Sequence, residues 1–193
     1  MSQPTLHRTD VAIVGAGVAG SALALELARA GLSVCLLEKT PYHEDNVRGE
    51  FLLPWGVAIA EDLGILTAME RAGGNYTRWA IPYGEGLDPI SAQHLRKDIS
   101  LVMPGVRGAL NLEHRILCQV LNEEAEAAGA LLLRSVGRIE FKGGLYPRLS
   151  YSRNDKAFEL QARVVVGADG RNSTIARQAG VRQSFSLSYW VAC

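Results

Sequence analysis

One segment, residues 10–39, constrains the fold of this chain more than any other. Its successive parts are an apolar run at 11–14, glycines 15, 17 and 20 in the spacing G-x-G-x-x-G, helical periodicity over 21–30, Gly31, a second apolar run at 33–37 and Glu38. The short apolar runs are typical of buried strands, and Gly31 stands where helices commonly end in a left-handed residue. The order of strand, glycine loop, helix and strand predicts a dinucleotide-binding βαβ unit rather than a glycine-rich turn without a function.

The glycine loop suits a diphosphate for reasons of space and charge. Gly15 permits a tight turn, Gly17 lets a pyrophosphate approach the backbone, and Gly20 allows close packing of the helix on the strand. The start of the helix presents unpaired N–H groups and a partial positive charge to the phosphates. The candidate cofactor-binding residues of this segment are Gly15, Ala16, Gly17, Val18, Ala19 and Gly20.

Glu38 and Lys39 follow the second apolar run. A carboxylate at this strand end can bind both hydroxyls of an adenosine ribose and would repel a 2′-phosphate. We therefore expect FAD or NAD in this site, not NADP. Both residues join the candidate cofactor-binding set.

Composition excludes several other classes of protein. The chain has 193 residues, with 20 Lys and Arg against 20 Asp and Glu, and no basic stripe, which argues against a nucleic-acid partner. We expect no membrane span, because the apolar segment 11–37 carries charges and loop glycines, and no signal peptide, because no basic segment and small-residue cleavage site frame it. The three cysteines are far apart in sequence; inert core thiols at Cys35 and Cys118 and a reducing, cytoplasmic setting are expected.

The remaining pattern indicates an α/β fold with a parallel central sheet and an inserted antiparallel meander. Residues 1–8 are polar and expected to be frayed. Helices are expected at 54–63, 65–71, 112–128 and 173–179, strands outside the main sheet at 77–83 and 99–103, a buried strand at 130–133, a meander at 138–142, 146–152 and 158–162, a parallel strand at 163–166 and a final strand at 184–191.

With residues 15–38, the triplet Arg48-Gly49-Glu50, Arg115 and the triplet Ala168-Asp169-Gly170 in family order, the chain resembles the FAD-dependent monooxygenases of the para-hydroxybenzoate hydroxylase fold. Geranylgeranyl reductases and flavin-dependent halogenases share that fold superfamily. The resemblance covers essentially the whole chain and implies a Rossmann-like FAD-binding domain in two parts, 1–75 and 112–180. It also implies a substrate-region excursion at 76–111 and the start of a substrate-domain strand at 181–193, so that the chain looks like the amino-terminal half of such an enzyme.

The same resemblance implies further cofactor contacts. Arg48 and Arg115 would reach toward the flavin side of FAD, the backbone near Val136 would contact adenine, and Asp169 with Gly170 would sit against the pyrophosphate and ribityl chain. Simpler alternatives stay open, because Arg48 also fits a solvated loop cation, Arg115 a surface partner of Glu113 or Gln119, and Asp169 a turn former. One departure is that Ala176 stands where the family has an arginine, with Arg177 one position later.

These residues and this resemblance predict an FAD-binding oxidoreductase. We expect tightly bound FAD, NAD(P)H as a transient electron donor, and oxygen-dependent hydroxylation of a small organic, aromatic or polyketide-like substrate. No residue can be assigned a catalytic role, and no metal site is expected. The alternatives are a flavin-dependent reductase or halogenase, a non-catalytic FAD-binding fragment completed by a carboxyl-terminal partner chain, and an NAD-binding domain without flavin. An unpaired final strand also predicts self-association.

Overall fold

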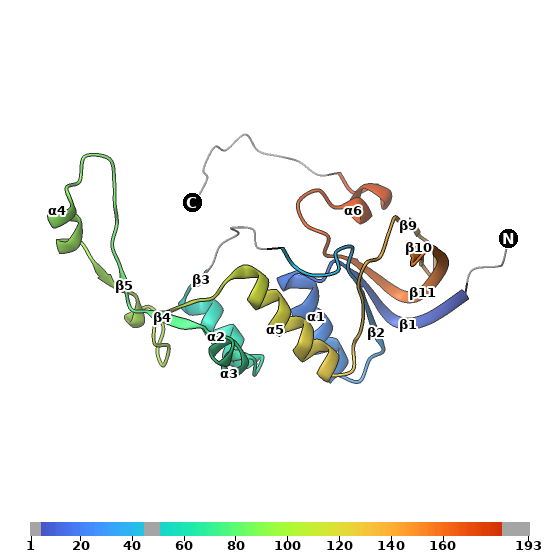
Figure 1. Cartoon of the computed structure of the whole chain (residues 1–193), viewed down its shortest axis with the longest axis horizontal. Helices are drawn as coiled ribbons and strands as arrows, with labels where there is room; N and C mark the ends of the chain where they lie inside the picture. The colour runs from blue at the N-terminus through green and yellow to red at the C-terminus, as the bar shows by residue number, and fades with distance from the viewer. Residues whose placement is uncertain (1–4, 45–50, 183–193) are drawn as a thin grey trace. The chain divides into compact units, whose positions relative to one another are not determined.

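A computed structural model describes residues 5–44 and 51–182 of the chain (Figure 1). The chain divides into two compact units. The first comprises residues 1–44 and 121–193 and contains the glycine loop, and the second comprises residues 45–120. Arg48 and the expected strand at 184–191 lie outside the described residues.

The first unit is built on a six-stranded sheet with the order β8-β2-β1-β11-β10-β9. Its first four strands are mutually parallel, and β10 and β9 continue the sheet in antiparallel fashion. The strands are β1 (Thr5–Val14), β2 (Val34–Leu37), β8 (Leu131–Leu133), β9 (Ile139–Lys142), β10 (Arg148–Arg153) and β11 (Lys156–Gly167). The predicted α/β class with a parallel central sheet is confirmed.

Three expectations for this sheet were wrong in detail. Residues 5–8, expected to be frayed, extend β1 and pair with residues 158–161 of β11. The third meander strand and the parallel strand at 163–166 are one continuous strand, β11, because the same backbone pairs with β10 on one side and with β1 on the other. β8 was expected to be buried, yet Leu131 is exposed because β8 is the edge strand.

Alternate residues of the parallel strands face two different layers, as the period of two in a strand requires. Ala12 and Val14 of β1 and Cys35 and Leu37 of β2 belong to a core cluster with residues of β10, β11 and α6 (Thr174–Gln178). Their sequence neighbours Ile13 and Leu36 are fully buried too, and α1 (Val18–Arg29) packs on these strands. The result is a sheet covered on both faces, which is typical of parallel sheets.

Cys35 is an interior residue of this sheet. Burial raises the pKa of its thiol to about 12, so the thiolate that reacts with oxidants and alkylating agents is not populated at neutral pH. This agrees with the prediction of an inert core thiol. Cys118 is buried as well.

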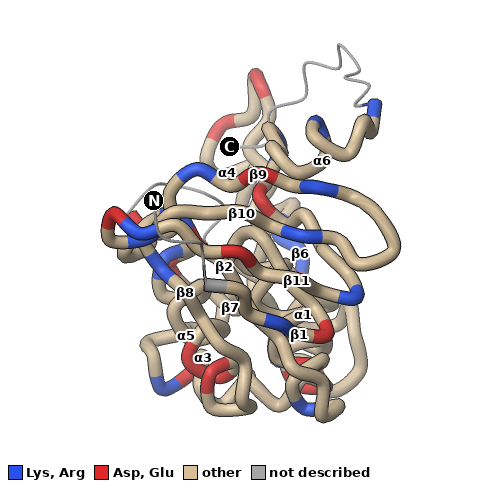
Figure 2. The backbone as a smooth tube through the Cα atoms, turned by 90° about the vertical axis from the view of Figure 1, so that its right-hand side faces the viewer, with Lys and Arg blue, Asp and Glu red and all other residues tan. Residues whose placement is uncertain are grey.

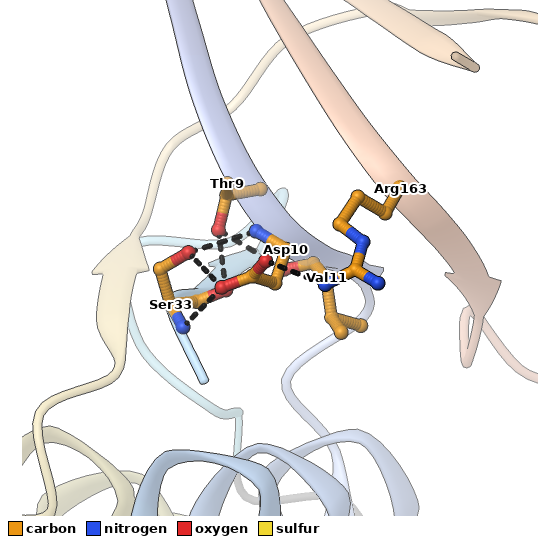
Figure 3. Close-up of polar contacts among 5 residues, drawn as sticks. All are labelled: Thr9, Asp10, Val11, Ser33 and Arg163. Atoms are coloured by element: carbon orange, nitrogen blue, oxygen red, sulfur yellow. Dashed lines mark hydrogen bonds and ion pairs between the residues drawn. The ribbon is translucent and has the colours of Figure 1, made fainter. Parts of the chain in front are cut away.

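A polar cluster links the middle of β1 to Ser33, which directly precedes β2, and to Arg163 of β11 (Figure 3). Asp10 Oδ2 accepts hydrogen bonds from the Ser33 N–H at 3.0 Å and the Ser33 hydroxyl at 2.7 Å, and Asp10 Oδ1 pairs with Arg163 Nη1 at 3.3 Å. Thr9 Oγ1 donates to the Ser33 carbonyl at 2.6 Å. The hydrogen bonds from Ser33, followed by the hydrogen bond from Arg163, lower the pKa of Asp10 below its ordinary value.

We expect Asp10→Ala to lower the thermal midpoint at pH 7, because the carboxylate that holds the Ser33 turn is lost. A lowered folded-state pKa means that this contribution is present above the ordinary value of 3.8 and disappears as the pH falls through the folded value. Thermal melts at pH 7 and at decreasing pH would therefore show the two proteins converging. Arg163→Met is the matched comparison, because it removes only the partner of Asp10 Oδ1. If Arg163→Met lowered the thermal midpoint more than Asp10→Ala, the hydrogen bonds from Ser33 would not be the main contribution of Asp10.

The second unit contains α2 (Pro54–Asp62), α3 (Leu66–Arg71) and a three-stranded antiparallel sheet of β3 (Phe51–Leu52), β7 (Ala109–Asn111) and β4 (Asn75–Thr77). A separate pair, β5 (Trp79–Ala80) and β6 (Lys97–Asp98), frames α4 (Pro89–His94). The strands between residues 75 and 111 lie outside the main sheet, as predicted, but the run expected at 77–83 is divided between β4 and β5, and β3 was not predicted as a strand. The strand expected at 99–103 is instead a 3-10 turn at Ile99–Leu101, because Asp98 Oδ1 accepts the Ser100 N–H at 3.0 Å and curls the chain.

The boundary at residues 120 and 121 falls within α5 (His114–Ala127). None of the described helices is long and apolar enough to cross a membrane. Figure 2 shows both basic and acidic residues in the first unit, and several form pairs, such as Arg148 with Glu159 at 3.6 Å and Arg138 with Glu140 at 3.2 Å.

Candidate cofactor-binding site

The three glycines of the loop differ in what surrounds them. Gly15 has a φ of +106°, and a Cβ there would overlap the Ala168 carbonyl. A Cβ on Gly20 would overlap the Gly15 carbonyl oxygen. Gly17 has no heavy atom within 4 Å of the position of a Cβ. Gly15 and Gly20 thus serve the close packing of the loop, whereas Gly17 borders open space from which a ligand can reach the backbone.

We expect Gly20→Ala to destabilise the first unit even without any cofactor. The new methyl group would force the Gly15 carbonyl away, and overpacking of this kind costs about 1–3 kcal/mol. Chemical denaturation of the cofactor-free chain measures this loss. A variant as stable as the wild type would contradict the tight contact between Gly20 and Gly15.

The amino end of α1 is left without a protein cap. Gly17 occupies the N-cap position, no side chain caps the helix, and its first turn holds no acidic residue. By contrast, Asp88 caps α4 and Ser173 caps α6. Among the described residues, none accepts a hydrogen bond from the N–H groups of Gly17, Val18 or Ala19. Because the helix dipole adds a partial positive charge here, this end of α1 suits an anion such as a diphosphate.

Glu38 lies directly after β2, buried with 8% exposure, and its carboxylate holds the loop. Oε2 accepts the Ala16 N–H at 2.9 Å, and Oε1 accepts the Thr40 N–H at 3.0 Å and the Thr40 hydroxyl at 2.8 Å. A carboxylate oxygen can accept two hydrogen bonds, so Oε2 retains capacity for a ribose hydroxyl. Burial acts to raise the pKa of Glu38, but these hydrogen bonds outweigh it, and the net pKa is lowered.

The turn formed by Ala168, Asp169 and Gly170 packs against the glycine loop, although the two are far apart in sequence. The Ala168 N–H donates to the Val14 carbonyl at 2.8 Å, and Gly170 has a φ of +86°. Asp169 Oδ2 accepts the Thr174 N–H at 2.6 Å, and its Oδ1 accepts the Ser173 hydroxyl. Asp169 therefore fixes the start of α6; its predicted contact with the pyrophosphate stays a prediction.

Val136 lies beside Glu38. Its N–H donates to the Glu38 carbonyl at 3.0 Å, and among the described residues none donates to its own carbonyl. The Val136 carbonyl is therefore the backbone group that could make the predicted contact, by accepting a hydrogen bond from the adenine amino group.

Two of the other predicted residues do not belong to the described part of the first unit. Arg115 belongs to the second unit, where its Nε lies 2.8 Å from Glu113 Oε2. Arg48 lies outside the described residues. Lys39 is exposed next to Glu38. The flavin-side contacts of the two arginines remain predictions.

Sequence reasoning missed Asn122 and Arg134. Asn122, on α5, is 1% exposed and donates to the Ala16 carbonyl at 3.0 Å, and Arg134 follows β8 and donates to Asn122 Oδ1. The available signal was an asparagine on the side of α5 that also carries the apolar residues Cys118, Leu121 and Ala125. The described residues contain no cluster of His, Cys, Asp or Glu that could hold a metal ion.

The uncapped helix, the open space over Gly17 and the carboxylate after β2 together define a dinucleotide-binding protein of the Rossmann class, and these residues fit the ADP half of FAD. Comparison with known families identifies the particular family. Residues 8–191 match the model of the FAD binding domain, and the chain belongs to this family.

Three curated relatives carry different activities. The chain is 31% identical over 177 residues to 6-methylpretetramide 4-monooxygenase from Streptomyces rimosus, covering 90% of the chain and 41% of the relative. It is 26% identical to 1H-pyrrole-2-carbonyl-(peptidyl-carrier protein) chlorinase from Pseudomonas fluorescens, covering 95% of the chain and 45% of the relative. It is 29% identical to digeranylgeranylglycerophospholipid reductase 2 from Methanothermobacter thermautotrophicus, with the same two coverages.

Among solved structures, PqsL from Pseudomonas aeruginosa, described as a probable FAD-dependent monooxygenase, superposes with a TM-score of 0.74 at 26% identity. The match covers 95% of this chain and 48% of PqsL. The chain thus spans less than half the length of these relatives. The comparisons confirm the predicted family and the Rossmann-like fold.

Proposed function

We propose that the protein is an FAD-dependent monooxygenase that uses NAD(P)H and oxygen to hydroxylate an aromatic or polyketide-like substrate. The observation that carries the FAD part is the open space over Gly17 at the uncapped end of α1, with Glu38 beside it. The match to 6-methylpretetramide 4-monooxygenase supports the hydroxylase part. When bound, the flavin supplies the redox and oxygen chemistry, and the residues described above bind and orient its ADP half.

A halogenase or a reductase is the second candidate, because the chlorinase and the reductase match the chain with similar identity and coverage. The glycine loop does not distinguish these activities, because it would hold the ADP half of FAD in the same way in each candidate. The substrate contacts that would distinguish them are not assigned to any described residue.

The first test is the absorbance spectrum of the purified protein, with release and chromatographic identification of the bound molecule. FAD is the expected result, and a protein that binds NADH but not FAD would contradict the proposal. Turnover then separates the candidates. NAD(P)H consumption with oxygen uptake supports hydroxylation, a requirement for halide supports halogenation, and anaerobic reduction of a double bond supports a reductase.

A further inference from the structure

Asn122 is a polar residue in the packed interior, on the buried side of α5 next to Leu121. Burying a carboxamide is unfavourable unless its donors and acceptors are satisfied. Its Nδ2 donates to the Ala16 carbonyl at 3.0 Å and to Ser21 Oγ at 2.6 Å. Its Oδ1 contacts His43 Nε2 at 3.2 Å and accepts from Arg134 Nη2. The two donors and two lone pairs of the amide are all in use.

The orientation of this amide is fixed by its partners. The Ala16 carbonyl can only accept a hydrogen bond, so Nδ2 must face the glycine loop. A guanidinium can only donate, so Oδ1 must face Arg134. His43 Nε2 then carries a proton and donates to the same oxygen. If the amide were flipped, Nδ2 would face the donors of Arg134 and His43, and Oδ1 would face the Ala16 carbonyl. Because both arrangements are unfavourable, Asn122 is held in one orientation.

Asn122 thereby connects three segments that surround the proposed ADP-binding position. These segments are the glycine loop through Ala16, the residues after β2 through His43, and the end of β8 through Arg134. Ala16 is held from both sides, because Glu38 accepts its N–H at 2.9 Å while Asn122 and Ser21 donate to its carbonyl, both at 3.0 Å. The peptide groups that follow Ala16 are the ones that carry the free N–H groups of Gly17, Val18 and Ala19.

We propose that Asn122 is a positioning residue for the cofactor, because it fixes the Ala16 peptide so that the free N–H groups of the glycine loop already point at the diphosphate before FAD binds. Such preorganisation raises affinity by removing the entropy loss of ordering the loop on binding. This inference rests on the proposed binding of FAD. It concerns only the ADP half of the cofactor, so ADP alone is a valid probe.

The test compares three variants in the full chain. Asn122→Leu keeps the approximate volume but removes all four hydrogen bonds, and Asn122→Asp keeps the shape and the acceptor for Arg134 while losing both donors. Leu121→Ala is the matched control, because Leu121 is equally buried on the same helix and makes no polar contact with the loop. Circular dichroism and thermal melts establish that each variant folds. Flavin fluorescence titration gives the Kd for FAD, and competition with ADP gives the Kd for the ADP half.

We expect each Asn122 variant to raise the Kd for FAD and the Kd for ADP by a similar factor. This factor should be about tenfold or more, which is the effect expected from losing a buried hydrogen bond. Leu121→Ala should lower the thermal midpoint and leave both Kd values unchanged. The inference alone is overturned if either folded Asn122 variant binds as tightly as the wild type, if FAD binding weakens while ADP binding does not, or if Leu121→Ala weakens binding equally. A wild-type chain that binds neither FAD nor ADP overturns the proposed function and this inference with it.

Discussion

Gly17→Val is expected to prevent FAD binding while leaving the chain folded. No heavy atom lies within 4 Å of a Cβ at position 17, so the protein itself has room for the side chain. The same space is the approach of the diphosphate to the free N–H groups at the start of α1. Loss of two charge-assisted hydrogen bonds of about 1.5 kcal/mol each would reduce affinity by more than about 100-fold.

The measurement is a fluorescence titration with FAD, paired with a thermal melt of the cofactor-free protein. Ala127→Val is the matched control, because it introduces the same valine side chain at an exposed residue that lies at the end of α5. It should bind FAD like the wild type. Two results would contradict the proposal that the diphosphate occupies the space over Gly17. One is a Gly17→Val variant that still binds FAD, and the other is a Gly17→Val variant that is destabilised as Gly20→Ala is expected to be.

The elements that sequence patterns predicted well are those whose cause is local. Gly31 has the expected positive φ of +81° at the end of α1, and Pro54 begins α2. The signal for α4 was also present, since Asp88 and Pro89 form a cap and a first helical residue, but the turn-rich composition around them obscured it. Local chemistry of this kind is readable because it needs no knowledge of distant partners.

The features that could not be predicted depend on residues far apart in sequence. Residues 5–8 carry no strand pattern of their own and extend β1 because β11 supplies a parallel partner. The same long-range pairing merges the third meander strand with the parallel strand. The contact between Asn122 and Ala16 likewise joins α5 to the glycine loop, and the helical period shows only that an asparagine lies on an apolar side. Sequence periodicity thus predicts elements but not their partners.

Glu38→Ala is expected to affect both stability and cofactor binding. Three hydrogen bonds to the carboxylate are lost, which releases Ala16 and Thr40, and bonds to a charged group contribute about 1.5–3 kcal/mol each. Because Glu38 is 8% exposed, we expect water to replace part of these hydrogen bonds, which leaves a loss of about 3 kcal/mol in the free energy of unfolding. FAD affinity should also fall, because the proposed acceptor for the ribose hydroxyls is gone. Denaturation and FAD titration measure the two effects.

Glu126→Ala is the matched control for this variant, because Glu126 is an exposed carboxylate of the same unit. It should change neither the free energy of unfolding nor the Kd for FAD appreciably. Equal losses in the two variants would show that a general effect of charge, and not the hydrogen bonds of Glu38, is responsible.

The pH dependence of the stability lost in Glu38→Ala distinguishes the effect of the ionised carboxylate from the effect of side-chain packing. The folded-state pKa of Glu38 lies below the ordinary 4.5, because the hydrogen bonds from Thr40 and Ala16 outweigh the effect of burial. Its contribution to stability is therefore complete above pH 4.5 and declines as the pH falls through the folded value, where the carboxylate takes up a proton. The difference in unfolding free energy between wild type and Glu38→Ala should be constant from pH 7 to about pH 5 and shrink below it. A difference that stays the same in acid would mean that Glu38 acts through packing alone, and the ionised carboxylate would then have no part in holding Ala16 for the cofactor.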